Sequence, residues 1–444
     1  MSAENTIDLG AYVARARQAP SPRPEGRVAE VLGQLVLVEG MAAVVGAQLE
    51  TTIGSRRLGL EVLGFRRGAV LAAPLGAVAG LAPGTPVRVS RGGGQLPVGP
   101  ALLGRVIDPF GAPLDGRPTP RCAERAPLHA APPPAFARRP ISRPLETRVR
   151  AIDAVLPLGV GQRVGLFAGT GVGKSTLLGM LCRHSVADVI VVGLVGERGR
   201  EVGDFVRGAL GASGLARGVV VAATSDAPPL VRARGALAAT AVAEYFREQG
   251  KSVLLVMDSV TRYAMALREA SLAAGEPPMT KGYTPTVFAS LPSLLERAGN
   301  SAHGGSITAI YTVLVEGDDL QDPIADAVRG ILDGHIVLSR QLADRGIFPA
   351  IDVLRSVSRV VTDICTPEHL AATQRARDLL GTYAEAADLI SIGAYVPGTD
   401  ARIDAACAAR PRLEALLKQS LTEAAPAAAS RDALRVIAAK STAS

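Results

Sequence analysis

The chain has 444 residues, enough for about three domains at roughly 150 residues each. With 48% hydrophobic and 20% charged residues, its composition is that of a globular protein and excludes a largely disordered chain. The net charge of +7 suggests an anionic partner, but 43 of the 48 basic residues are Arg, and the first of five lysines is Lys174. An Arg excess of this kind indicates background composition, so the charge alone identifies no partner. Aromatic residues make up only 3%, and the core is therefore expected to be aliphatic.

Cysteine usage and hydropathy narrow the cellular setting. The four cysteines are far apart in the sequence, with no CxxC, which favours isolated thiols in a reducing cytoplasm over disulfides or a zinc site. Residues 1–17 carry Glu4 and Asp8 and contain no apolar core of a signal peptide. No stretch of 18 uncharged apolar residues occurs, so we expect a soluble intracellular protein without a membrane span.

The amino-terminal part predicts a helix and then a small β domain. Residues 5–18 could form a short amphipathic helix, which the prolines of 20–26 end; segment 1–26 is either a frayed tail or a docking helix for a partner. Residues 27–98 contain short apolar runs broken by Gly and Pro, which predicts a β-barrel or sandwich. Phe65 is its only aromatic residue, which disfavours an oligonucleotide-binding barrel, because such barrels stack bases on aromatic side chains.

The remainder predicts an α/β core followed by helices. A proline-rich connector occupies 117–144, and apolar runs of four to eight residues then alternate with helical patterns. This alternation indicates a mostly parallel sheet covered on both faces. Beyond Thr366 two helical stretches follow, in the second of which Pro411 predicts a break. We therefore expect an N-terminal barrel at 27–98, an α/β domain at 99–365 and a helical domain at 366–444.

The strongest motif follows the apolar run at 163–167. Residues 168–176 read AGTGVGKST and precede a helical pattern, the setting of a G-x-x-x-x-G-K-[ST] phosphate-binding loop in which Ala168 replaces the first Gly. Glycines let successive N–H groups point inward, and the helix N-terminus adds a positive dipole. We expect Lys174 to reach the β and γ phosphates and Ser175 to bind Mg²⁺. The residues of this loop expected to bind nucleotide are Gly169, Thr170, Gly171, Val172, Gly173, Lys174, Ser175 and Thr176.

Two acidic residues follow other apolar runs. SVLLVMD ends in Asp258, at the place where a nucleoside triphosphatase needs a carboxylate on the metal side. DVIVVGLV is followed by Glu197 and Arg198, at the edge where a parallel sheet places its ligands. Glu197 could polarise the attacking water and Arg198 could complement phosphate charge. From spacing alone, Glu197 could equally be an N-cap or part of a surface ion pair.

Together these motifs resemble the flagellar and type III secretion export ATPases, relatives of the rotary ATP synthase catalytic subunit. The resemblance runs from about residue 27 to 406 and is densest between 149 and 361. KGYTPTVFA, DLISIGAY and IADAVRGILDGHIVLSR look more like the flagellar than the injectisome branch. The other blocks that carry it include GLFAGTGVGKSTLLGM, VVGLVGERGREVGDF, VLLVMDSVTRYAMALREASLAAGEPP and SVSRV.

The resemblance implies a RecA-like P-loop core and a role for each matching residue. Glu197 is then the catalytic base, and Arg198 and Arg262 lie near the γ-phosphate. Phe348 stands where the family usually has a Tyr stacked on adenine, and an apolar ring can still stack. Arg359 in SVSRV matches an arginine finger that acts in the neighbouring subunit's site, which makes activity depend on a ring. Ser259 stands where the synthase subunit often has Asn, as in the export branch.

The implied function is an Mg²⁺-dependent ATPase that energises or primes protein export by the flagellar apparatus. The implied setting is the cytoplasm, peripherally at the inner-membrane export apparatus. Implied partners are further copies in a homohexamer, a stator-like regulator at the N-terminus, a central stalk protein, the export gate, chaperones and substrates, with no specific nucleic acid. The alternatives are an injectisome ATPase, a non-catalytic nucleotide-binding ring subunit, which Glu197 argues against, and a hexameric nucleic-acid motor.

Overall fold

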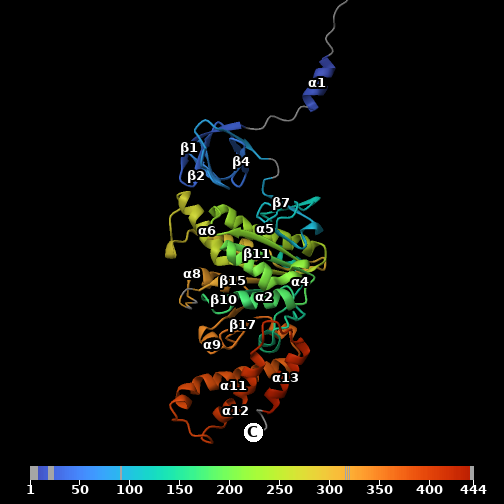
Figure 1. The fold of residues 1–444 in the computed structure, drawn as a ribbon, viewed down its shortest axis with the longest axis vertical. Coiled ribbons are helices and arrows are strands. Elements are labelled where there is room, and N and C mark those ends of the chain that lie inside the picture. Colours follow the sequence, from blue (N-terminus) through green and yellow to red (C-terminus); the bar gives the residue numbers. More distant parts are fainter. Residues whose placement is uncertain are drawn as a thin grey trace, which may run out of the picture. The chain divides into compact units, whose positions relative to one another are not determined.

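The structure, a computed structural model, describes residues 9–18, 25–90, 93–315, 317, 319 and 321–440. It divides into two compact units between Gly93 and Gly94. The first unit contains helix α1 (Leu9–Gln18) and a closed six-stranded antiparallel barrel, so the predicted barrel is confirmed (Figure 1). Around the barrel the strands run β1-β2-β5-β4-β3-β6. They are β1 (Glu25–Leu32), β2 (Leu35–Glu39), β3 (Gln48–Ile53), β4 (Arg56–Arg66), β5 (Ala69–Pro74) and β6 (Pro86–Val89).

Alternating side chains form the interior of the barrel. Val36, Val38, Leu60 and Val87 are fully buried, and each is separated from the next inward residue of its strand by one outward residue, as the two-residue period of a strand requires. The last barrel strand ends at Val89. Strand β7 (Gln95–Val98) lies in the second unit, where it pairs with β9 (Glu124–Pro127).

The second unit is built on a nine-stranded sheet in the order β17-β16-β10-β15-β13-β11-β12-β8, with β14 paired to β15. Figure 1 labels β10, β11, β15 and β17 of this sheet. All neighbours are parallel except the short pairs β16–β17 and β14–β15. The predicted mostly parallel sheet is therefore confirmed. Its strands are β8 (Arg105–Ile107), β10 (Arg163–Ala168), β11 (Val189–Glu197), β12 (Gly218–Thr224), β13 (Ser252–Asp258), β14 (Gly299–Asn300), β15 (Ser306–Leu314), β16 (Gly334–Val337) and β17 (Val357–Ser358).

Side chains alternate along the central strands between two aliphatic cores. In β11, Val191 packs in one core and Val192 in the other, which explains the continuous apolar runs of the sequence. One core is covered by helix α5 and its neighbours, the other by α2 and the C-terminal helices. The helices of the α/β part are α2 (Lys174–His184), α3 (Gly199–Asp204), α4 (Gly211–Ala216), α5 (Pro229–Glu248), α6 (Val260–Ala273), α7 (Pro285–Leu295), α8 (Pro323–Ile331), α9 (Arg340–Asp344) and α10 (Val361–Ile364).

Short π and 3₁₀ turns connect these elements. The π-helical turns are η3 (Ala151–Val155) and η4 (Phe205–Leu210). The 3₁₀ turns are η1 (Pro100–Leu102), η2 (Ala135–Ala137) and η5 (Thr280–Gly282).

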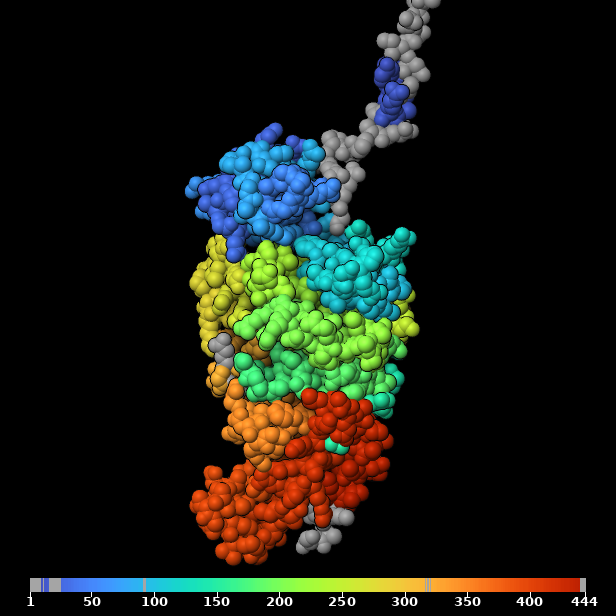
Figure 2. Space-filling view, in the orientation of Figure 1, coloured from blue at the N-terminus to red at the C-terminus, as the bar shows by residue number. Residues whose placement is uncertain are grey.

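Three helices form the C-terminal part: α11 (Pro367–Ser391), α12 (Ala401–Leu417) and α13 (Ala427–Lys440), whose surface is orange to red in Figure 2. The predicted break at Pro411 is wrong, because α12 continues through this residue. Proline removes one hydrogen bond, and packing on both sides holds the helix together: Leu413 is fully buried, and the Arg410 guanidinium lies 3.8 Å from the Tyr383 ring centre. Among the residues that the structure describes, no helix is long and apolar enough to cross a bilayer.

Candidate active site

The predicted phosphate-binding loop connects β10 to α2. Gly171 and Gly173 have φ angles of 80° and 92°, in the left-handed region that favours glycine, and α2 begins directly afterwards at Lys174. The fully buried Val172 side chain anchors the loop in the core, and Gly169 and Thr170 complete the turn. Residues 169–173 therefore form the turn, and Lys174, Ser175 and Thr176 form the first turn of α2, an arrangement at a helix N-terminus that binds phosphate oxygens.

The charged residues expected around the loop meet at the carboxyl ends of three parallel strands. The Lys174 ammonium donates a hydrogen bond to the Asp258 carboxylate, and its Nζ lies 3.9 Å from Glu197 Oε1. Asp258 ends β13 and Glu197 ends the adjacent β11, where Leu194 is the register partner of Asp258. The three side chains are 14%, 5% and 16% exposed, so water screens their charges only partly.

A fourth member of this cluster escaped the sequence analysis. The Thr312 hydroxyl donates to Asp258 Oδ1 over 2.7 Å and is fully buried on β15. This strand lies between β10 and β13, so Thr312 comes next to the loop only in the folded sheet. The available signal was Thr312, the second of two threonines in the mostly apolar run SITAIYTVLV.

Glu197 has an environment that suits a proton acceptor. Burial raises its pKa to about 7, and the negative charge of Asp258 adds to the rise, while Lys174 opposes it. Glu197 also shares a hydrogen bond with Glu201, which lowers the pKa of Glu201. A carboxyl whose pKa lies near neutrality can take a proton from water at physiological pH.

The two arginines expected at the γ-phosphate differ in position. The stem of Arg262 packs over Gly196, since a Cβ at Gly196 would lie 3.1 Å from the Arg262 Cβ, and this places Arg262 beside Glu197. The Arg198 side chain is 82% exposed and lies 3.5 Å from Glu201, so this conformation does not bring it into the cluster. Arg262 is therefore the better placed of the two.

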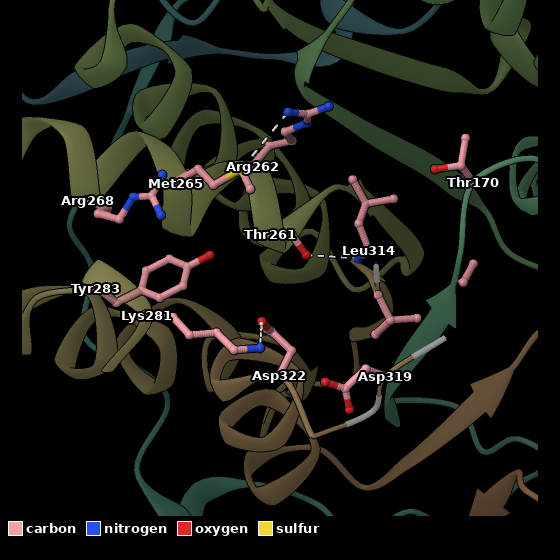
Figure 3. A pocket seen from close by; sticks show the side chains of 12 residues that line it. Thr170, Thr261, Arg262, Met265, Arg268, Lys281, Tyr283, Leu314, Asp319 and Asp322 are labelled. Carbon is pink, nitrogen blue, oxygen red and sulfur yellow. Dashed lines mark hydrogen bonds and ion pairs between the residues drawn. The ribbon is translucent and has the colours of Figure 1, made fainter. Parts of the chain in front are cut away.

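A cavity of about 360 Å³ opens beside the loop. Figure 3 shows Thr170 on one side, Arg262 and Arg268 from α6 on the other, and the Lys281 side chain reaching toward Asp322. The Lys281 ammonium lies 3.3 Å from the Asp322 carboxylate, which also caps the N-terminus of α8. The lining is thus mixed in charge and continuous with the phosphate-binding loop.

Phe348 lies against the loop from a different direction. A Cβ at Gly173 would be 3.5 Å from the Phe348 ring, and the Phe348 carbonyl accepts a 2.8 Å hydrogen bond from the backbone N–H of Gln419. A hollow of about 320 Å³ lies along the same helix, α2, with Ser175 and Thr176 at its loop end and Leu421 of the C-terminal part in its wall. The lining of this hollow also includes charged side chains, and Phe348 is not part of it. The Phe348 ring beside the predicted phosphate site suits stacking on a nucleobase.

Arg359 lies apart from all these residues. It follows β17, and its guanidinium donates to the Arg329 carbonyl over 3.4 Å at the exposed surface. Its backbone N–H donates to the carbonyl of Asp333, which pairs with Arg163 at the start of β10. The phosphate-binding loop follows the other end of β10, roughly 16 Å away at about 3.3 Å per residue. The structure therefore does not bring Arg359 to its own chain's loop.

The phosphate-binding loop, its lysine and two carboxylates at the carboxyl edge of a parallel sheet define a P-loop nucleoside triphosphatase. Residues 148–358 match the nucleotide-binding domain of the ATP synthase alpha/beta family, and residues 365–436 match the C-terminal domain of the type III secretion ATPase EscN.

Whole-chain relatives specify the family further. The flagellum-specific ATP synthase of Salmonella typhimurium is 50% identical over 441 residues, covering 97% of each chain. A type 3 secretion system ATPase of Xanthomonas euvesicatoria is 50% identical over 386 residues, covering 86% of this chain and 87% of its own length. Assembled EscN of enteropathogenic E. coli, alone and with its central stalk EscO, has TM-scores of 0.88 and 0.87 at 44% and 43% identity, covering 93% of this chain and 100% of that one.

The chain therefore belongs to the family of flagellar and type III secretion ATPases, and it is an ATP-binding, ATP-hydrolysing enzyme. The predicted family, fold and enzyme class are confirmed. The match to the flagellar relative extends over more of the chain than the match to the secretion ATPase, which supports the flagellar interpretation.

Proposed function

We propose that this chain acts as a homohexameric ring ATPase that energises or primes protein export by the flagellar apparatus, through chaperone release and substrate unfolding. ATP hydrolysis by this chain is supported by the contact of Lys174 with Asp258 and Glu197 at the carboxyl end of the sheet. A role in flagellar export is supported by the similarity to flagellum-specific ATP synthases. The proposed division of labour is a docking segment at 1–26, a barrel at 27–98, the ATPase part at 99–365 and a helical part at 366–444.

ATP binding would rearrange the charges of the cluster. The loop N–H groups and Lys174 hold the β and γ phosphates, so phosphate oxygens replace Asp258 as the partner of the lysine. We place the adenine beside the Phe348 ring, next to the hollow that has Thr176 at its loop end and Leu421 in its wall. The lysine charge that pairs with Asp258 in the structure thereby becomes available to the substrate.

The cluster also suits Mg²⁺. Asp258, Ser175 and Thr312 offer only hard oxygen donors, which Mg²⁺ prefers, together with substrate phosphates and water. Ser175 would bind the ion directly and Asp258 through water, with Thr312 orienting the carboxylate. When bound, the ion neutralises negative charge on the β and γ phosphates.

Hydrolysis then requires a base and charge stabilisation. Glu197 orients a water and accepts its proton at a carboxylate oxygen, while the water oxygen bonds to the γ-phosphorus and the bond to the β–γ bridging oxygen breaks, leaving ADP and phosphate. Arg262, beside Glu197, balances charge on the γ-phosphoryl from within the chain, and Arg198 could do so after rotation of its exposed side chain. Arg359 of the next subunit supplies the remaining positive charge.

The other partners remain proposals with surface features in their support. Helix α1 exposes Leu9, Tyr12 and Val13, an apolar set that suits a stator-like regulator. The end of α11 and the turn after it expose Leu389, Ile392 and Val396, which suits chaperones, export substrates or the export gate. The structure of EscN with its central stalk EscO supports a stalk partner in the ring. We place the enzyme in the cytoplasm, peripherally at the inner-membrane export apparatus.

The experiment that tests the catalytic proposal is Glu197→Gln. We expect nucleotide binding to persist while turnover falls by about 10³-fold, because the amide cannot accept the proton of the water. Binding is measured by equilibrium titration and turnover by phosphate release. Glu385→Gln, the same change on an exposed face of α11, is the control. Near-normal turnover in Glu197→Gln would remove Glu197 from the role of base.

The ring is tested separately by the dependence of turnover on protein concentration. If each site borrows a group from its neighbour, the rate per subunit rises steeply as the chains assemble. Assembly is followed in the same samples by light scattering. If a demonstrably monomeric sample has the same rate per subunit as the assembled sample, the shared site is contradicted.

A further inference from the structure

The backbone of Arg359 is held in a dense hydrogen-bond network. Its N–H donates to the Asp333 carbonyl over 2.9 Å, and the same carbonyl accepts from Gln162 Nε2 over 3.1 Å. Gln162 Nε2 also lies 3.2 Å from the hydroxyl of Ser358, the residue before Arg359. Gln162 is fully buried, so no water competes for its side-chain amide. The amide therefore fixes the segment around Asp333 relative to the segment around Ser358.

Asp333 joins this network to the start of β10. Its carboxylate accepts two hydrogen bonds of 2.9 Å from the Arg163 guanidinium and a third of 3.0 Å from the Arg163 N–H, while its own N–H donates to the Arg163 carbonyl over 2.9 Å. The Asp333 side chain is 24% exposed and that of Arg163 13%. A bidentate pair with this little water fixes both distance and orientation.

Close backbone packing between β16 and β17 also holds the backbone of Arg359 in place. Gly334 pairs with Ser358 across β16 and β17, and a Cβ at Gly334 would lie 2.5 Å from the Val357 carbonyl. Only glycine lets the two short strands approach this closely. By contrast, the Arg359 guanidinium is exposed, with one long hydrogen bond to the Arg329 carbonyl. A rigid base therefore carries an exposed cationic head group.

We propose that Asp333 is the positioning residue of the arginine that this chain supplies to its neighbour: through Arg163 and Gln162 it ties the Arg359 backbone to the first residues of β10. The proposal rests on the proposed shared site. It has a physical consequence, because β10 ends in the chain's own phosphate-binding loop. The strand β10 then connects two groups: its carboxyl end leads into the loop before Lys174, and its amino end holds the backbone of Arg359 through Asp333.

The test begins with Asp333→Asn. The amide keeps the size of the side chain but points an NH₂ group or a single neutral oxygen at the guanidinium, so the bidentate pair is lost. Misplacing a reacting group by about 1 Å can cost roughly 10²-fold in rate. We expect turnover to fall by about that factor, with the KM for ATP unchanged because the variant's own pocket is intact. Normal turnover would overturn the proposal.

Mixed rings separate positioning from general damage. Lys174→Ala chains lose the lysine of the phosphate-binding loop and are expected not to hydrolyse ATP themselves, but they keep an intact Arg359. Asp333→Asn chains keep an intact pocket. In a head-to-tail ring made from equal amounts of both, about a quarter of the interfaces join an intact pocket to a well-placed arginine. We expect turnover to return to about that fraction of the wild-type rate. If Asp333 only supported its own β10, mixing would restore nothing.

A second mixture separates the positioning role of Asp333 from the shared site on which it rests. Arg359→Ala mixed with Lys174→Ala should recover in the same way. If it recovers and the Asp333→Asn mixture does not, the positioning role is wrong and the shared site remains. If neither recovers, the shared site itself fails. Should Asp333→Asn not fold, Arg163→Lys serves instead, because it keeps the charge facing Asp333 but loses the paired hydrogen bonds.

Discussion

The two ends of β10 hold charged groups in opposite ways. At the carboxyl end, Lys174 is surrounded by Asp258 and Glu197, and the side chains satisfy one another within one chain. At the amino end, Arg359 is fixed mainly through its backbone, and its exposed guanidinium makes one long hydrogen bond, to the Arg329 carbonyl. The first arrangement is a pocket that can bind a ligand by itself. The second is a cation on a rigid support, which becomes useful only when another molecule brings an anion to it.

Among the substitutions that distinguish the two ends of β10, Arg359→Ala is expected to have the largest effect on turnover. Removing a trans-acting arginine costs about 10³-fold or more in turnover, because charge on the γ-phosphoryl is left unbalanced. Nucleotide affinity of the unassembled chain should not change, since Arg359 does not reach its own loop. Phosphate release and equilibrium nucleotide titration measure the two quantities. Arg355→Ala, on the same exposed segment, is the control. If Arg359→Ala lost nucleotide binding, Arg359 would belong to its own chain's pocket, and the contrast between the two ends of β10 would be wrong.

A smaller effect is expected at the pocket end from Phe348→Ala. Loss of the ring beside Gly173 should raise the KM for ATP roughly tenfold, the value of one aromatic stacking contact. Inhibition by inorganic tripolyphosphate, which has no base, should stay unchanged. Phe348→Tyr should retain the wild-type KM. An equal loss of affinity for ATP and tripolyphosphate would show that Phe348 supports the phosphate-binding loop and does not contact the adenine.

The smallest effect is a shift in pH dependence from Glu201→Gln. Burial, Asp258 and the hydrogen bond shared with Glu201 raise the pKa of Glu197, and a base works only when ionised, so turnover should rise as the pH increases through that pKa. Replacing Glu201 with a neutral amide removes one of the raising influences. The acidic limb of the kcat profile should then move to lower pH, whereas Glu385→Gln leaves it in place. An unmoved limb would mean that Glu201 does not influence the base.

Much of the pocket could be predicted because its signals are local. A glycine-rich stretch between an apolar run and a helical pattern identified Lys174, and runs ending in an acid identified Asp258 and Glu197. Thr312 and Glu201 were missed, because a hydroxyl in an aliphatic run and a second glutamate in GERGRE become informative only when their neighbours in space are known. Pro411 misled for the same reason, since packing around α12 outweighs a local helix breaker.

The sequence by itself determined the fold class, the phosphate-binding loop and, through its family motifs, the candidate residues, because strand and helix periods and the loop glycines are properties of short segments. Only the tertiary structure decided which of these residues meet. It brought Glu197 close enough to Asp258 for burial and charge to raise its pKa, left Arg198 at the surface, and tied Arg359 to the far end of β10 through Asp333. Distances between residues remote in sequence depend on how the strands are ordered in the sheet, and no local pattern encodes that order.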